Sequence, residues 1–161
     1  MTCPDPEQFP QACPVGTYSV VGDSQCHFCP PGKSCETGSP VDCSAGFYQI
    51  GGNDQCTKCP AGHYCASKAL KPIKCSLGYY SAPGATSCTI CPAGSFCSSP
   101  ELFPALCQPS TTSVAGSVKC TGCPIGAVCN TDGTSTDCTA TGQITNQLGT
   151  GCIVSNLYIR L

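Results

Sequence analysis

The stretch from Cys43 to Cys65, CSAGFYQIGGNDQCTKCPAGHYC, carries a frame of four cysteines that organises the whole chain. A first cysteine is followed by twelve residues, a second by two, a third by five, and the fourth closes the frame; we name these positions a, b, c and d. The frame recurs with the same spacings, so that four copies are Cys13, Cys26, Cys29, Cys35; Cys43, Cys56, Cys59, Cys65; Cys75, Cys88, Cys91, Cys97; and Cys107, Cys120, Cys123, Cys129. A fifth copy begins with Cys138 and Cys152, with one residue more between a and b. Successive a positions lie 30 to 32 residues apart, which is the fixed period of a repeat architecture.

This period predicts how the chain is divided. The expected segments are a lead-in with the end of a preceding repeat at 1–12, full repeats at 13–42, 43–74, 75–106 and 107–137, and a partial fifth repeat with an apolar tail at 138–161. Cys3 precedes Cys13 by nine residues, a spacing that elsewhere separates a d cysteine from the next a. We therefore expect Cys3 to belong to an incomplete repeat and to be unpaired in this chain or bonded outside it.

The composition indicates a disulfide scaffold in an oxidising compartment. The 161 residues include 19 Cys, 18 Gly and 15 Pro, whereas Leu, Ile, Val and Phe together number only 27, too few for one large core. Such scaffolds persist outside the cytosol, so an extracellular or cell-surface location is expected. The first residues, MTCPDPEQFP, have neither the basic start nor the apolar run of a signal peptide, which predicts a processed start or an excerpt of a longer protein.

Residues other than cysteine repeat as well, and they predict short β-hairpins with essentially no helix. Proline follows each c cysteine and glycine follows two residues later, as in Pro60 and Gly62, which is typical of a turn with a glycine at positive φ. Between a and b, the first three copies contain G-x-Y, and a second glycine marks the turn of a hairpin that the cysteines close. We expect small disulfide-rich repeats, stacked as an elongated rod, in which one tyrosine of each copy packs on the disulfides of its neighbour: Tyr18, Tyr48 and Tyr80. Ser110 and Thr112 replace the glycine and tyrosine in the fourth copy, which is expected to pack less well.

The sequence does not favour a catalytic, metal-binding or cofactor-binding role. The C-x-x-C pairs are further apart than in zinc sites and lack the βαβ context of redox enzymes. The two histidines, His27 and His63, have no ligand or catalytic partner at a suitable spacing, and no nucleophile beside a base, calcium loop or phosphate loop is present. With 7 basic and 9 acidic residues, and Lys68, Lys71 and Lys74 as the one basic cluster, we expect no nucleic-acid partner, and no apolar run is long enough to insert into a membrane.

Serine and threonine clusters are candidates for O-linked glycosylation, since no N-x-S/T sequon occurs. The candidate residues are Ser110, Thr111, Thr112, Ser113, Thr134, Ser135 and Thr136.

The run C-P-x-G-x-Y from Cys13 to Tyr18, followed by C-x-x-C-P-x-G, resembles the ephrin-receptor-like cysteine-rich repeat, a relative of tumour necrosis factor receptor and growth-factor-receptor modules. The resemblance extends from Cys13 to about Cys152 and implies a series of small modules. It also implies disulfides from a to b, namely Cys13–Cys26, Cys43–Cys56 and Cys75–Cys88, with Cys107–Cys120 by spacing. The five-residue c-to-d loop differs from the receptor pattern, so a receptor-type ligand groove is not implied.

Two disulfide schemes fit the cysteine frame. Pairing a with b and c with d gives nine bridges and leaves Cys3; it completes the pair Cys138–Cys152 and agrees with the hairpin of the relatives. An interlaced scheme pairs b with d and c with the next a, and it leaves Cys3, Cys13 and Cys152. The local scheme is favoured, and both leave their unpaired cysteines near the ends of the chain.

These features together predict an extracellular structural or adhesive segment, such as part of a stalk, surface coat or fibre, with neighbouring copies of itself or of a longer array as partners. Low charge and few clustered aromatic anchors support this interpretation. The alternative is a ligand-binding receptor ectodomain, for which Phe103 in the spacer SSPELFPAL is the best candidate contact.

Overall fold

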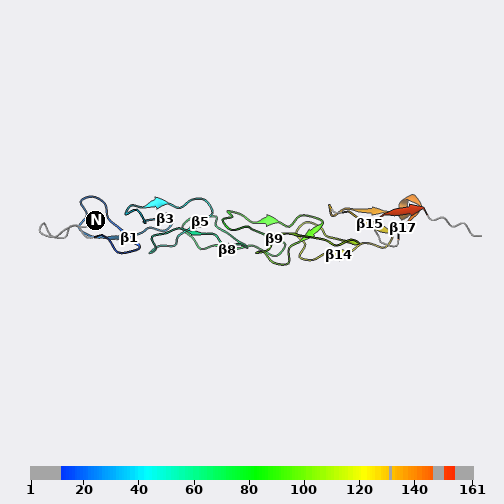
Figure 1. Ribbon diagram of the computed structural model, residues 1–161, viewed down its shortest axis with the longest axis horizontal. Coiled ribbons are helices and arrows are strands. Elements are labelled where there is room, and N and C mark those ends of the chain that lie inside the picture. The colour runs from blue at the N-terminus through cyan, green and yellow to red at the C-terminus, as the bar shows by residue number, and fades with distance from the viewer. Residues whose placement is uncertain (1–11, 131, 147–150, 155–161) are drawn as a thin grey trace, which may run out of the picture. The chain divides into compact units, whose positions relative to one another are not determined.

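The structure is a computed structural model that describes residues 12–130, 132–146 and 151–154. Figure 1 shows short strands separated by loops along the chain. Contacts group the chain into two compact units, one made of residues 1–75 and 81–88 and the other of residues 76–80 and 89–161.

The described strands form nine two-stranded antiparallel sheets. In each of the four full repeats, one sheet lies between a and b, and a second joins the c-to-d turn to the residues before the next a. The sheets between a and b pair β1 (Thr17–Tyr18) with β2 (His27–Phe28), β5 (Phe47–Tyr48) with β6 (Thr57–Lys58), β9 (Tyr79–Tyr80) with β10 (Thr89–Ile90), and β13 (Thr111–Thr112) with β14 (Thr121–Gly122). The second sheets pair β3 (Lys33–Ser34) with β4 (Val41–Asp42), β7 (His63–Tyr64) with β8 (Ile73–Lys74), β11 (Ser95–Phe96) with β12 (Ala105–Leu106), and β15 (Ala127–Cys129) with β16 (Ser135–Asp137). The partial repeat pairs β17 (Gln143–Thr145) with β18 (Cys152–Val154).

The G-x-Y segment shapes the hairpin between a and b. Gly16 has φ of +82°, and its carbonyl accepts a hydrogen bond of 2.8 Å from the N–H of the c cysteine, Cys29. Ser110 replaces this glycine in the fourth copy, keeps a φ of +65°, and its carbonyl accepts the equivalent bond from Cys123 at 3.0 Å. The fourth copy therefore retains the hairpin without the glycine, and its weaker packing stays a prediction.

The Pro-x-Gly segment shapes the second hairpin. In the second copy, His63 donates its N–H to the Pro60 carbonyl at 3.3 Å, and Gly62 takes φ of +72°. The Gly62 carbonyl then accepts the N–H of Cys75, the next a cysteine, at 2.8 Å. The turn thus returns the chain to the start of the following copy.

Half-cystines make up most of the small core. The buried apolar residues are Cys29, Cys35, Cys43, Cys59, Cys65, Cys75, Cys91, Cys97, Cys138, Ala127 and Val128. The nine disulfides join a to b and c to d: Cys13–Cys26, Cys29–Cys35, Cys43–Cys56, Cys59–Cys65, Cys75–Cys88, Cys91–Cys97, Cys107–Cys120, Cys123–Cys129 and Cys138–Cys152. The interlaced scheme does not occur, and Cys3 lies outside the described residues. Nine disulfides suggest an oxidising extracellular environment.

The described residues contain no α-helix, and the one helical turn is a 3₁₀ turn, η1 (Thr139–Thr141). In the part of the chain that the structure describes, no helix is long and apolar enough to cross a membrane. The predicted class of small disulfide-rich hairpin repeats is confirmed, whereas their arrangement into a rod stays a prediction. The architecture is consistent with an extracellular cysteine-rich module.

Candidate functional site: the junctions between repeats

Consecutive repeats are joined mainly through backbone atoms. We number positions from the cysteines, so that a+6 is the sixth residue after a, and we call the contact between consecutive full repeats a junction. In the third junction, between repeats 75–106 and 107–137, three backbone bonds and one serine hydroxyl connect the c-to-d turn of one repeat to the hairpin of the next. They are Gly94 N–H to Ser113 O (2.9 Å), Cys97 N–H to Ser117 O (3.0 Å), Gly116 N–H to Cys91 O (2.8 Å) and Ser113 Oγ to Ser95 O (2.6 Å).

The second junction repeats this pattern position by position. The serine at a+6, Ser81, is again buried, and its hydroxyl bonds the residue two places before d. The bonds are Gly62 N–H to Ser81 O (3.1 Å), Cys65 N–H to Ala85 O (3.0 Å), Gly84 N–H to Cys59 O (2.7 Å) and Ser81 Oγ to His63 O (2.8 Å).

The first junction keeps two of these donors but has glutamine at a+6. Gly32 N–H donates to the Gln49 carbonyl at 2.7 Å, and Cys35 N–H donates to the Asp54 carbonyl at 2.7 Å. Asp54 is at a+11, whereas the equivalent acceptors Ala85 and Ser117 are at a+10. The c-to-d turn of one repeat can therefore bond the next repeat in a register that differs by one residue.

The glycine of each G-x-Y segment permits close approach between repeats. A Cβ added to Gly16, Gly46 or Gly78 would fall on the carbonyl oxygen of a glycine in the next repeat. These oxygens belong to Gly52, Gly84 and Gly116 respectively. The sequence signal that indicated a turn thus also marks a backbone contact.

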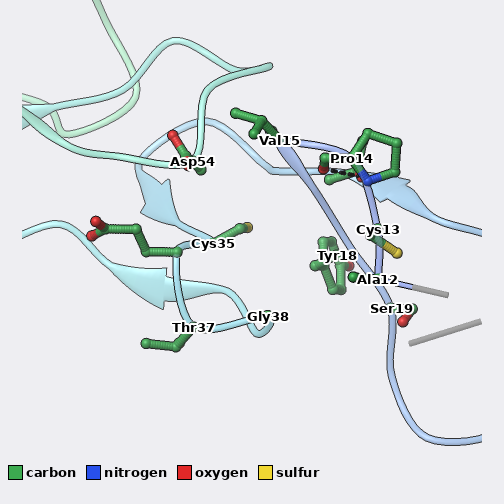
Figure 2. A pocket seen from close by; sticks show the side chains of 13 residues that line it. Ala12, Cys13, Pro14, Val15, Tyr18, Ser19, Cys35, Thr37, Gly38 and Asp54 are labelled. Atoms are coloured by element: carbon green, nitrogen blue, oxygen red, sulfur yellow. Dashed lines mark hydrogen bonds between the residues drawn. The ribbon is translucent and has the colours of Figure 1, made fainter. Parts of the chain in front are cut away.

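A hollow of about 420 Å³ lies beside the first repeat, lined by residues 12–19, residues 35–38 and Asp54. Figure 2 shows Thr37 and Gly38 on one side of it and Tyr18 and Ser19 on the other. Its lining includes two acidic residues, Glu36 and Asp54, and no basic residue. It has no catalytic arrangement of side chains among these lining residues.

Charged groups are sparse and lie at the surface. Lys33 Nζ lies 2.7 Å from Asp42 Oδ1, and this hydrogen bond, together with the charge of Lys33, lowers the pKa of Asp42. The Thr134 hydroxyl and amide lower the pKa of Asp132, and those of Thr139 lower the pKa of Asp137. Within the described ranges, no group of three or more His, Cys, Asp or Glu side chains could hold a metal ion.

The predicted packing tyrosines are half-buried on the strands that start each hairpin. The Tyr18 ring lies 5.8 Å from that of His27, its cross-strand partner, and the Tyr80 ring lies 6.0 Å from that of Phe103 in an edge contact. Packing of Tyr18, Tyr48 and Tyr80 on a neighbouring disulfide stays a prediction.

The candidate glycan residues differ in accessibility, and Ser113 must be removed from the candidates. Its side chain is buried and its hydroxyl donates to Ser95 O, so it is not available to a glycosyltransferase in the folded repeat. Thr111 and Thr112 are half-buried, whereas Ser110, Thr134, Ser135 and Thr136 are exposed. The exposed residues remain candidates.

The sequence prediction missed the polar residue at a+6. It is Ser19, Gln49, Ser81 or Ser113, and all four are buried. A polar residue directly after the tyrosine position in each of the four full copies was the available signal, because a buried polar side chain requires a hydrogen-bond partner.

Comparison with known proteins adds no relative: no protein-family model matches the chain, and no curated protein is significantly similar to it.

Proposed function

We propose that this chain is an extracellular structural or adhesive segment without catalytic activity, in which repeats of the ephrin-receptor-like type connect to form part of a stalk, coat or fibre. The observation that carries this proposal is that the second and third junctions use the same donors and acceptors at the same positions. Backbone bonds of this kind depend on shape and glycine placement more than on particular side chains, so they suit an array that extends by adding copies.

The disulfides support the same proposal. Each full repeat has one bridge at the base of its a-to-b hairpin and a second across its c-to-d turn. A short module closed twice keeps its form with a very small apolar core, and such modules are typical of extracellular proteins.

A receptor ectodomain is the second candidate, favoured by an exposed aromatic residue in the spacer SSPELFPAL. Phe103 is 70% exposed although it contacts the half-buried Tyr80 ring. Aromatic side chains of this kind often anchor protein interfaces.

Immunogold electron microscopy of unpermeabilised native material tests these proposals. Label on ordered fibres or a continuous surface layer supports the structural function. Single molecules at the surface, each with a bound protein ligand that is lost in a Phe103→Ala variant, support the receptor. Label confined to the cytosol contradicts both.

A further inference from the structure

The first residue after the b cysteine is threonine in three of the four full repeats: Thr57, Thr89 and Thr121. Each threonine begins the second strand of its a-to-b hairpin, namely β6, β10 and β14. The next residue of the same strand differs in every repeat: Phe28, Lys58, Ile90 and Gly122. Both positions are exposed in all these strands, so neither burial nor strand propensity explains why only the first position repeats its residue type.

The hydroxyl groups of Thr57 and Thr89 have no structural task in the folded repeats. Among the residues that the structure describes, neither Oγ1 atom donates or accepts a hydrogen bond. A threonine elsewhere in these hairpins does use its hydroxyl, since Thr111 Oγ1 donates to the Gln108 carbonyl at 2.6 Å. Valine, which is also β-branched, would therefore serve the strand at Thr57 and Thr89 as well as threonine does.

A tyrosine lies opposite each of these two threonines. Thr57 pairs with Tyr48 across the sheet, and Thr89 pairs with Tyr80. Residues directly opposite in an antiparallel pair project from the same face, with Cβ atoms about 5 Å apart. Both tyrosines are half-buried, so each keeps part of its surface exposed beside the threonine. A group attached to the threonine oxygen therefore has an aromatic side chain to pack against.

Two disulfides hold the threonine in place. Cys56, directly before Thr57, is bonded to Cys43, and Cys59, two residues after it, is bonded to Cys65. The repeat 75–106 has the same pair of bridges around its own threonine. The exposed hydroxyl is therefore presented in one geometry that exists only after the bridges have formed.

We propose that Thr57 and Thr89 are acceptors for an O-linked sugar that a transferase adds to the folded, oxidised repeat. In this transfer, the threonine Oγ1 forms a bond to the anomeric carbon of a nucleotide-activated sugar. The bond from that carbon to the phosphate oxygen of the nucleotide breaks, and the hydroxyl proton passes to a base of the transferase. The cysteine frame and the tyrosine define these sites, in contrast to the serine and threonine clusters considered above. The proposal goes beyond the structural or adhesive function and does not depend on it.

The repeats differ in the occupancy that we expect. Thr121 has neither the unused hydroxyl nor the tyrosine, because its Oγ1 donates to the Thr112 carbonyl at 3.3 Å and Thr112 is also its cross-strand partner. The first repeat has His27 at this position and therefore no hydroxyl. We expect modification at Thr57 and Thr89, less at Thr121 and none at the equivalent position of the first repeat.

Mass spectrometry of the native protein tests the proposal directly. After reduction and digestion, peptides should carry the mass of a sugar, which electron-transfer fragmentation should place on Thr57 and on Thr89. The occupancy of Thr121 should be lower than that of either. Native protein in which both Thr57 and Thr89 are bare overturns the proposal.

An acceptor assay separates recognition of the folded repeat from recognition of the local sequence. The full chain, refolded with its disulfides, is incubated with microsomes of the source organism and with radiolabelled nucleotide sugars, one at a time. The oxidised chain should incorporate label, and the reduced and alkylated chain should incorporate none. Equal labelling of the two forms overturns the proposal, because the transferase would then read only the sequence.

Matched variants locate the label. The double variant Thr57→Val and Thr89→Val should lose it, whereas Thr86→Val, which removes an exposed hydroxyl from a hairpin tip, should keep it. Valine preserves strand propensity, and unchanged amide spectra would show that the double variant is folded. Tyr48→Leu should reduce the label at Thr57 and leave that at Thr89 unchanged. Label that persists at full level in the double variant overturns the proposal.

Discussion

The first and third junctions share two backbone donors, one of which bonds a different acceptor in each. At both, the N–H of the c-to-d glycine bonds the a+6 carbonyl, through Gly32 to Gln49 in one and Gly94 to Ser113 in the other. The d cysteine then donates to a+10 at the third junction but to a+11 at the first, where the acceptor is Asp54. The glycine turn is therefore the same at both junctions, whereas the acceptor at the tip of the next hairpin varies.

The side chain at a+6 explains the difference. Gln49 Nε2 donates to the Asn53 carbonyl at 2.6 Å, and Gln49 Oε1 accepts the Gly51 N–H at 2.6 Å. The a+10 carbonyl of this repeat is therefore engaged within its own hairpin tip, and the N–H of Cys35 bonds the next carbonyl instead. A serine side chain at a+6 is too short to reach the turn of its own a-to-b hairpin, so its hydroxyl bonds the preceding repeat across the junction.

Reduction of all disulfides should abolish both junctions together, and this is the largest expected effect. In the chain-entropy model, a bridge that closes about 14 residues contributes about 3 kcal/mol, and the described residues contain nine bridges with few other buried apolar side chains. Far-ultraviolet circular dichroism and amide exchange should show an unfolded chain after full reduction. Unchanged spectra would mean that the apolar contacts suffice.

Substitution of the glycine that contacts the next repeat should be the most damaging single change. Gly78→Ala at the third junction places a Cβ on the Gly116 carbonyl oxygen, and Gly16→Ala does the same to Gly52 at the first. Each variant should lose roughly 2 kcal/mol more than a matched control, because the clash adds to the strain of positive φ. Denaturant unfolding under oxidising conditions measures the difference.

The control is Gly22→Ala, which has φ of +95° but no atom within 4 Å of the added Cβ. It isolates the backbone strain from the contact between repeats. Equal losses in Gly16→Ala and Gly22→Ala would show that the first junction relaxes around the added methyl group.

Ser113→Ala removes the hydroxyl that crosses the third junction and should cost about 1–2 kcal/mol, because the buried Ser95 carbonyl loses a partner. The control is Ser117→Ala, whose hydroxyl bonds Val114 O within its own hairpin and should cost less than about 0.5 kcal/mol. The free energy of unfolding of both variants decides the matter. Equal free energies of unfolding would show that the Ser113 hydroxyl bond across the junction stabilises the protein no more than the Ser117 bond within its hairpin.

Gln49→Ser should convert the first junction toward the register of the third. Without the glutamine amide, the Asn53 carbonyl loses its partner and becomes the acceptor at a+10 for Cys35 N–H. A through-hydrogen-bond coupling from the Cys35 amide nitrogen should then connect to the Asn53 carbonyl carbon in place of that of Asp54. A coupling that remains with Asp54 would show that the doubled glycine, Gly51 and Gly52, sets the register.

The sequence predicted the local fold well because its strongest signals are local. The G-x-Y and Pro-x-Gly segments combine glycines at positive φ with cysteines close in sequence, and both form hairpins in the structure. Turn chemistry acts over a few residues and does not depend on the rest of the chain. Even Ser110 keeps the glycine conformation within the same hydrogen-bonded frame.

The second hairpin of each repeat and the junctions could not be predicted in the same way. The strand Ile73–Lys74 lies in a spacer with no alternating pattern, and it is set by the bond from Cys75 N–H to Gly62 O. Junctions made of backbone bonds leave little trace in side-chain identity, because any residue except proline has the required donor and acceptor. The traces that remain are glycines with no room for a Cβ and a polar residue at a+6.

The smallest expected effect concerns the ion pair on the second hairpin of the first repeat. Lys33 donates a hydrogen bond to Asp42 and attracts its carboxylate, so the folded-state pKa of Asp42 lies below its ordinary value of 3.8. Because the folded pKa is the lower one, this pair contributes stability above the ordinary pKa and loses it as the pH falls through the folded pKa. Carboxyl carbon shifts should give an Asp42 midpoint below 3.8 that rises in a Lys33→Met variant.

Asp132 is the internal control, since Thr134 lowers its pKa and the variant should leave that midpoint unchanged. An Asp42 midpoint that does not move with Lys33→Met would show that solvent screening removes the interaction at this exposed site.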